Sequence, residues 1–192
     1  EDATPARPTS KPFRVEWQPL TQENSTEPDR THFDSNLTRL LEATAANAQP
    51  SGLLLVRVDK SDQLHKRFGS SVVERLQQRV AEVVRHAARP EDLVCRLTSD
   101  NFAVLMPSVS PLAGIRAAEA IRSAVRQHPF RLDESGPELI VTASFGYGVC
   151  LPGDSNTLTI DRAGEALAKS QTVGRNQLHV HDAAQRQVTR VM

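Results

Sequence analysis

The amino-acid sequence contains no apolar run close to the roughly 18 residues that a membrane-spanning helix needs, and its N-terminus lacks the apolar segment of a secretory signal peptide. It also lacks an excess of charge of either sign, because 23 lysine and arginine residues balance 23 aspartate and glutamate residues. Bulk electrostatic attraction to nucleic acid or to an anionic membrane is therefore excluded. We expect a cytoplasmic protein with no membrane span in this chain and no nucleic-acid partner.

Cysteine is scarce as well: the chain has only Cys95 and Cys150, and each lies inside an apolar, strand-like run. This pattern favours two reduced, buried thiols, with a disulfide between them as the alternative. The six histidines show no metal-ligand spacing with the cysteines. His179 and His181 fall on one face of a terminal strand, which favours a surface pair over a metal site.

The 192 residues are enough for one domain with a substantial core and extra material at its ends. Residues 1–30 carry much proline, serine, threonine and charge, which predicts a flexible linker. Within it, the alternation of Phe13, Val15 and Trp17 predicts a docked strand at 13–17. We expect the folded domain over 31–182, and a polar tail or linker to a further domain over 183–192.

Two kinds of hydrophobic periodicity alternate along the folded region. Helical spacing predicts helices over 33–48, 71–88, 112–127 and 160–169, and apolar or alternating runs predict strands over 53–58, 139–150 and 176–181. A hairpin is expected from Leu93 to Met106, and a solvated loop around Lys60, Lys66 and Arg67. This order predicts an α/β (α+β) sandwich in which helices flank a central, mostly antiparallel sheet with a βααββαβ-like core.

The hairpin and the end of the last helix carry a family resemblance. The hairpin reads "RLTSDNFAVLMP" from Arg96 to Pro107, and the last helix runs through "AGEALAKSQTVGRN" to Asn176. In type, order and spacing these stretches resemble the GGDEF, or diguanylate cyclase, domain over about 31–182. The resemblance implies a nucleotidyl-cyclase-like fold in a bacterial signalling protein. It often implies an EAL domain downstream and a parent that regulates pili, biofilm or motility.

The resemblance also implies a chemistry, in which two GTP molecules are joined while carboxylate-held Mg²⁺ neutralises the phosphates. In this chain Arg57 falls on the position of the metal-binding aspartate, the first of the family's Asp-x-Asp run, and Asp59 matches the second aspartate of that run. The other positions that the resemblance assigns to the active site are His65, Glu74, Thr98, Ser99, Asp100, Asn101, Gln171 and Arg175. Of these, Arg175 retains the family's residue type, and the two glycines and the glutamate of the hairpin tip are replaced.

The arginine at position 57 is the main reason to predict an inactive domain. A guanidinium offers no oxygen to a divalent cation, and replacing −1 by +1 turns attraction into repulsion, each worth about 4 kcal/mol per pair of unit charges at 4 Å in a typical protein environment. The sequence therefore predicts a degenerate domain that is not an enzyme and holds no Mg²⁺. Asp100 is then expected to be a turn residue.

A second family motif precedes the hairpin. Arg89-Pro90-Glu91-Asp92 matches the family's RxxD inhibitory site in type and register, which implies cyclic di-GMP as the ligand. An arginine fork can donate to O6 and N7 of guanine, and a carboxylate can accept from its N1–H and amino edge. The simpler alternative is that Arg89 binds the carbonyl groups at the end of the preceding helix and Asp92 caps the turn.

Further arginines are candidates to complete this ligand site. The family's second arginine falls on Ala120, so Arg116 or Arg122 on the same helix is expected to replace it. Arg96 is a further candidate.

Three functions remain open on this evidence. The first is a cyclic di-GMP receptor that signals to attached domains, an EAL domain among them, or to a partner protein. The second is a dimerisation or protein-interaction domain that needs no nucleotide, with a homodimer as one form. The third is a regulator that holds GTP without turnover.

Overall fold

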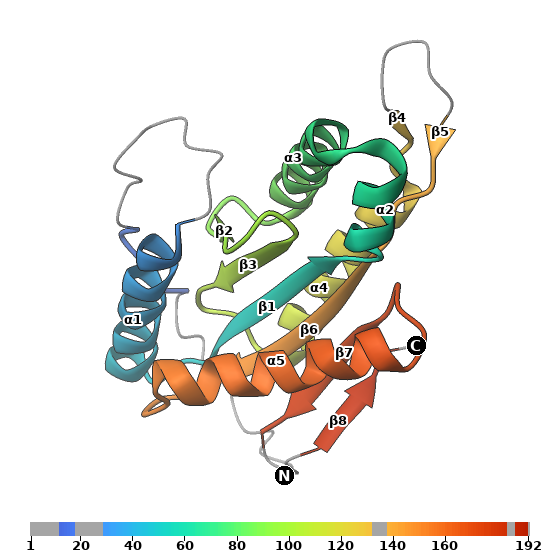
Figure 1. Ribbon diagram of the computed structural model, residues 1–192. Helices are drawn as coiled ribbons and strands as arrows, with labels where there is room; N and C mark the ends of the chain where they lie inside the picture. The colour runs from blue at the N-terminus through green and yellow to red at the C-terminus, as the bar shows by residue number, and fades with distance from the viewer. Residues whose placement is uncertain (1–11, 18–28, 132–137, 184–186, 192) are drawn as a thin grey trace, which may run out of the picture.

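The computed structural model describes residues 12–17, 29–131, 138–183 and 187–191, and its centre is a six-stranded sheet (Figure 1). The strand order is β2-β3-β1-β6-β7-β8, and neighbours are antiparallel except for β6 and β7, which are parallel. The strands are β1 (Ser51–Val58), β2 (Leu93–Arg96), β3 (Asn101–Met106), β6 (Ala143–Cys150), β7 (Leu178–Asp182) and β8 (Gln187–Arg190). A separate two-stranded sheet joins β4 (Phe130–Arg131) to β5 (Glu138–Leu139). The predicted fold class is confirmed.

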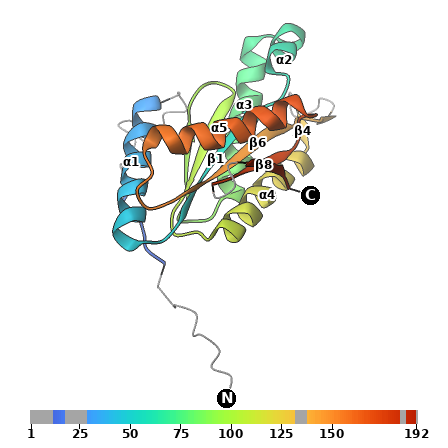
Figure 2. The same cartoon turned by 90° about the horizontal axis from the view of Figure 1, so that it is seen from below.

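Helices cover both faces of the sheet, and Figure 2 shows α4 and α5 on opposite sides. The helices are α1 (Arg30–Asn47), α2 (Ser61–Phe68), α3 (Ser70–Ala87), α4 (Pro111–Gln127) and α5 (Asn156–Thr172). One buried cluster joins the sheet to α3 and α4, and a second joins it to α1 and α5. Because side chains alternate along β1, Leu54 and Val56 enter the first cluster and Leu53 and Leu55 the second.

Three helices begin at side-chain caps. Asp29, Ser110 and Ser155 each accept a hydrogen bond from the main-chain N–H three residues later, at 2.8, 3.3 and 3.2 Å. Such a cap typically contributes about 1 kcal/mol. The caps fix where α1, α4 and α5 start, and α4 also has Pro111 in its first turn.

Some elements differ from the sequence prediction. The predicted solvated loop contains helix α2, which has eight residues, none of them fully buried, and only Leu64 and Phe68 as apolar side chains. The predicted strand at 139–150 begins only at Ala143, and Ile140 is 91% exposed. His179 and His181 are buried rather than on the surface, because β7 is a strand inside the sheet with β8 on its outer side.

The ends of the chain also have defined structure. Residues 12–17 belong to no helix or strand, and β8 lies within the segment predicted as a tail. The rest of the predicted linker, 1–11 and 18–28, lies outside the described residues. Cys95 and Cys150 are free and buried, as predicted. Within the described part of the chain, no helix is both long enough and apolar enough to cross a membrane.

Candidate functional site

The hairpin tip between β2 and β3 is closed by its own polar side chains. The hydroxyl of Thr98 donates to Asp100 Oδ1 at 3.0 Å and accepts from the main-chain N–H and the side-chain Nδ2 of Asn101, at 3.1 and 2.8 Å. Arg96 lies over the same tip, donating to the carbonyl oxygens of Thr98 and Ser99 at 3.3 and 3.2 Å. These contacts fix the shape of the turn without glycine.

Asp100 has a second role that the sequence interpretation missed. Arg57, near the end of β1, donates from Nε to Asp100 Oδ2 at 3.3 Å. The Asp100 side chain is 14% exposed and that of Arg57 is 46% exposed. Asp100 is therefore an ion-pair partner as well as a turn residue.

Asp59, directly after β1, joins three segments of the chain. Its carboxylate accepts from the hydroxyls of Thr142 and Ser144, both at 2.7 Å, and from the main-chain N–H of Asn176 at 3.0 Å. Arg175 and Asn176 both have positive φ, at 59° and 48°, so the turn after α5 is conformationally demanding. Asp59 holds this turn against the sheet.

The carboxylates at this end of β1 are bonded to protein groups in this structure. The carboxylate oxygens of Asp59 accept hydrogen bonds from protein groups, and Asp100 forms an ion pair with Arg57. Over the described ranges, no three His, Cys, Asp or Glu side chains gather as a metal site would require. The predicted lack of a metal is not tested by these contacts and stays a prediction.

The remaining active-site positions of the prediction lie on α2, α3 and α5. His65 Nδ1 is 2.9 Å from the carbonyl oxygen of Ser61 within α2, and Glu74 is exposed on α3. Burial lowers the pKa of Arg96, and the charge of Glu74 opposes that shift. Gln171 is half-buried at the end of α5.

The Arg89–Asp92 motif forms a tight turn between α3 and β2. Arg89 donates to both carboxylate oxygens of Asp92: from its main-chain N–H to Oδ2 at 2.9 Å, and from Nε and Nη2 to Oδ1 at 3.0 and 2.6 Å. The Asp92 side chain is 0% exposed and the Arg89 side chain 27%. Asp92 therefore caps the turn, as the simpler alternative expected.

Arg89 has two more partners. Nη1 pairs with Glu91 Oε1 at 3.1 Å, and Nη2 donates to the carbonyl oxygen of Pro107 after β3, also at 3.1 Å. Burial would lower the pKa of Arg89, but the hydrogen bond and charge of Asp92 offset it and raise that pKa. Burial raises the pKa of Asp92 against the bonds from Arg89. The raised pKa of Arg89 favours the charged guanidinium, whereas the raised pKa of Asp92 favours the neutral carboxyl group. The 2.6 Å contact between the two side chains supports the charged pair near neutral pH.

The two predicted arginines of α4 separate in the structure. Arg122 donates to both carboxylate oxygens of Glu119, at 2.8 and 2.6 Å, and to the carbonyl oxygen of Asn176 at 3.2 Å. It therefore faces the turn after α5, and its expected part in the ligand site stays a prediction. Arg116 is exposed and stays a candidate.

Sequence reasoning missed two side chains that bear on the Arg89 turn. The indole N–H of Trp17 donates to the carbonyl oxygen of Glu91 at 3.1 Å. The Tyr147 hydroxyl is buried, and its charge interactions reach Arg89 and Asp92. The alternation around Trp17 was a usable signal for docking, but nothing in the sequence indicates where it docks.

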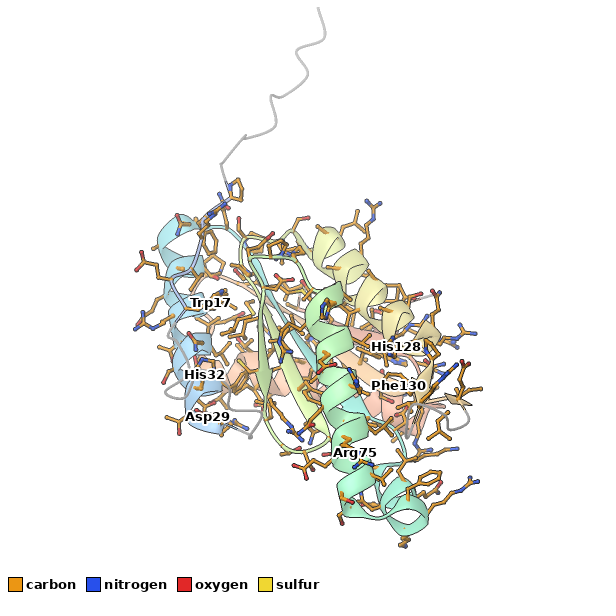
Figure 3. The ribbon with its side chains drawn as sticks, turned by 90° about the horizontal axis from the view of Figure 1, so that it is seen from above. Trp17, Asp29, His32, Arg75, His128 and Phe130 are labelled. Carbon is orange, nitrogen blue, oxygen red and sulfur yellow. The ribbon has the colours of Figure 1, made fainter. Side chains whose placement is uncertain are left out.

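A groove of about 890 Å³ lies between α3 and the end of α4. Figure 3 labels three of its lining residues: Arg75 on α3, His128 directly after α4, and Phe130 on β4. Two arginines of α3, Arg75 and Arg79, both lie along this groove.

Comparison with known proteins adds the family. A family model described as diguanylate cyclase, GGDEF domain, matches residues 26–177. The response regulator PleD of Caulobacter vibrioides is 27% identical over 149 residues, which cover 77% of this chain and 33% of PleD. The diguanylate cyclase DgcP of Pseudomonas aeruginosa is 28% identical over 145 residues, 74% of this chain and 21% of DgcP. This chain thus spans a third or less of these relatives.

A solved structure also resembles this chain in both fold and sequence. The crystal structure of the diguanylate cyclase SiaD in complex with its activator SiaC, from Pseudomonas aeruginosa, matches with a TM-score of 0.73 and 25% identity. The match covers 78% of this chain and 57% of that chain.

These relatives correct one prediction. DgcP and SiaD are named diguanylate cyclases, so the interpretation of this chain as a non-enzyme is contradicted. That interpretation gave too much weight to the charge of one side chain. Arg57 is almost half exposed and contacts Asp100 at 3.3 Å. Because exposed ion pairs of this kind contribute only about 0–1 kcal/mol, little free energy holds the guanidinium beside Asp100.

Proposed function

Because the chain belongs to the GGDEF family of diguanylate cyclase domains, we propose that it binds cyclic di-GMP at the turn of Arg89 and Asp92 and so takes part in cyclic di-GMP signalling. The observation that carries the proposal is the turn itself. It joins a partly exposed guanidinium to a carboxylate three residues later, with both groups fixed by hydrogen bonds. Guanine offers the complementary acceptors and donors.

Binding at this turn requires the Arg89–Asp92 pair to open. In the closed turn, Asp92 is fully covered and the Arg89 donors are directed at Asp92, Glu91 and Pro107. A guanine base can replace these partners, since O6 and N7 accept from arginine and N1–H donates to a carboxylate. Charged hydrogen bonds are then exchanged rather than lost, which keeps the cost of opening small.

The family likeness also supports a proposal for the rest of the site and for its setting. Arg116, exposed on α4, is the proposed additional cation for the ligand. We propose that the domain works in the cytoplasm and passes the ligand-bound state to attached domains, an EAL domain among them, or to a second copy or a partner protein.

Isothermal titration with cyclic di-GMP tests this proposal. We expect saturable binding by the full chain, weakened about 5- to 150-fold in Arg89→Ala because a bidentate arginine–guanine contact is worth about 1–3 kcal/mol. Arg85→Ala, an exposed arginine one turn earlier on α3, is the matched control and should bind like the wild type. Equal affinity of Arg89→Ala and wild type would refute the site. No heat at tens of micromolar would favour an interaction domain that needs no nucleotide.

Condensation of GTP to cyclic di-GMP is the second candidate, favoured by the names of DgcP and SiaD. Product formation with GTP and Mg²⁺, followed by chromatography, tests it. We expect Arg57→Asp to raise turnover above the wild-type level, because the substitution replaces a cation beside Asp100 with a second carboxylate. The comparison variant is Arg175→Ala, which leaves the Arg57–Asp100 pair in place and should therefore show no rise in turnover. Turnover that is unchanged or lower in Arg57→Asp would contradict a metal site at this position.

A further inference from the structure

An extended segment ahead of α1 lies against the Arg89 turn. In this segment, residues 12–17, Phe13, Val15 and Trp17 are partly buried and the residues between them are exposed. Val15 and Trp17 pack against the second buried cluster, which joins the sheet to α1 and α5, and Figure 3 shows Trp17 on the α1 side of the molecule. We name residues 12–17 the N-terminal strap.

One end of the strap is bonded to the turn itself. The Trp17 indole N–H donates to the carbonyl oxygen of Glu91, at 3.1 Å. Glu91 lies inside the Arg89–Asp92 turn, and its side chain pairs with Arg89 at 3.1 Å. The Trp17 contact therefore holds the peptide whose position sets the distance between Arg89 and Asp92.

The other end of the strap is bonded to the second loop that Arg89 contacts. The main-chain N–H of Phe13 donates to Ser108 Oγ at 3.2 Å, and Ser108 donates to Gln49 at 2.8 Å. Ser108 directly follows Pro107, whose carbonyl oxygen accepts from Arg89. The strap thus spans the same two loops that the guanidinium of Arg89 joins.

We infer that the N-terminal strap restrains the Arg89 turn in its closed form, with Trp17 as a positioning residue that opposes ligand binding. The inference rests on the proposed function, because the ligand is cyclic di-GMP at Arg89. Opening the turn separates Arg89 from Asp92 and moves the Glu91 peptide between them, and this movement breaks the Trp17 bond. Since coupling between two equilibria is reciprocal, bound ligand releases the strap and a released strap favours the ligand.

The strap contains the only tryptophan of the chain, so its release can be observed directly. Titrating the full chain with cyclic di-GMP should shift Trp17 emission to longer wavelength and increase its quenching by acrylamide. In calorimetry, Trp17→Phe keeps a ring but loses the N–H donor. We expect it to bind cyclic di-GMP about 2- to 12-fold more tightly, the range for one net hydrogen bond. Arg14→Ala, an exposed change on the same strap, should bind like the wild type.

The outcomes separate this inference from the function on which it rests. Tighter binding together with lower thermal stability of Trp17→Phe supports the restraint, since a merely structural role would not increase affinity. Binding by Trp17→Phe with none by the wild type supports it as well. Arg89-dependent binding that leaves Trp17 emission and Trp17→Phe affinity unchanged overturns the strap and leaves the proposed function intact. No binding by either protein overturns both.

Discussion

Tyr147 occupies a slot that two glycines leave open. Its ring lies on β6 against Gly52 of β1 and Gly114 of α4, and a Cβ at either glycine would overlap the ring. The ring is fully buried, and burial raises the pKa of its hydroxyl, so the group stays protonated. Within the described residues, no hydrogen-bond partner reaches this hydroxyl.

We predict that Tyr147→Phe unfolds at equal or higher urea concentration than the wild type. A buried hydroxyl without a partner costs about 1–3 kcal/mol by protein mutational data, and phenylalanine keeps the ring that fills the slot. Gly114→Ala is the contrasting variant, expected to lose about 1–3 kcal/mol because its methyl group must displace the ring. A loss of more than about 1 kcal/mol in Tyr147→Phe would mean that the hydroxyl has a partner.

At the level of single residues, the sequence predicted chemical types better than exposure. It identified Arg89 and Asp92 as candidate ligand contacts, and the structure shows that the two side chains pair with each other. It could not predict that Asp92 is fully covered, because one of the contacts that closes the turn comes from Pro107, 18 positions from Arg89 along the chain. In the same way, Asp100 reads locally as a turn residue, and its partner Arg57 lies 43 positions away.

At the scale of whole elements, α5 and β7 are joined by a buried polar contact. Ser170 on α5 donates to the carbonyl oxygen of Phe145 at 2.7 Å, and its Oγ lies 2.8 Å from His179 Nδ1 on β7. The hydroxyl proton is used by Phe145, so Nδ1 of His179 acts as the donor to Ser170. Burial lowers the pKa of His179, and the positive charges of Arg190 and Lys169 lower it further.

This shift predicts a loss of stability in weak acid. The folded-state pKa of His179 lies below the unfolded value of about 6.5, so the unfolded chain takes up the proton first as the pH falls. Stability from this group is complete above about pH 6.5 and decreases as the pH falls through the window between the two values. Urea unfolding of the wild type at pH 5 and pH 7.5 measures the difference.

Two variants test whether the loss of stability at low pH comes from His179. His179→Asn retains a donor for Ser170 but does not titrate, so its pH difference should be smaller than that of the wild type. His128→Asn changes an exposed histidine and should leave the difference unchanged. If His179→Asn and the wild type lose the same stability, the pH dependence originates elsewhere.

Elements with a buried stripe were predictable, and those without one were not. Helices α1, α3, α4 and α5 each bury residues at helical spacing, and the prediction placed all four. Helix α2 buries none, and its residues therefore read as loop. Strand β8 has a mostly exposed pattern and was missed because only its pairing with β7 makes it a strand.

For the molecule as a whole, composition and periodicity established the class of fold, and the family resemblance supplied its likeness to known cyclase domains. The strand order joins segments distant in sequence: β1 lies between β3 and β6, and Asp59 is bonded to Asn176. No local pattern encodes such neighbours. The site therefore emerged from sequence as separate motifs, and the structure shows how β1, β2 and the turn after α5 connect them.

Strand β2 gives these motifs a mechanical relationship. It contains four residues, Leu93–Arg96, with the Arg89 turn at one end and the hairpin tip at the other, and it pairs with β3 alone because it forms the edge of the sheet. Four extended residues span about 13 Å and can bend only a little along their length. A tilt imposed at Asp92 by the proposed ligand would be transmitted along this short strand to Thr98 and Ser99, which would couple the proposed guanine site to the hairpin tip without any contact between the two.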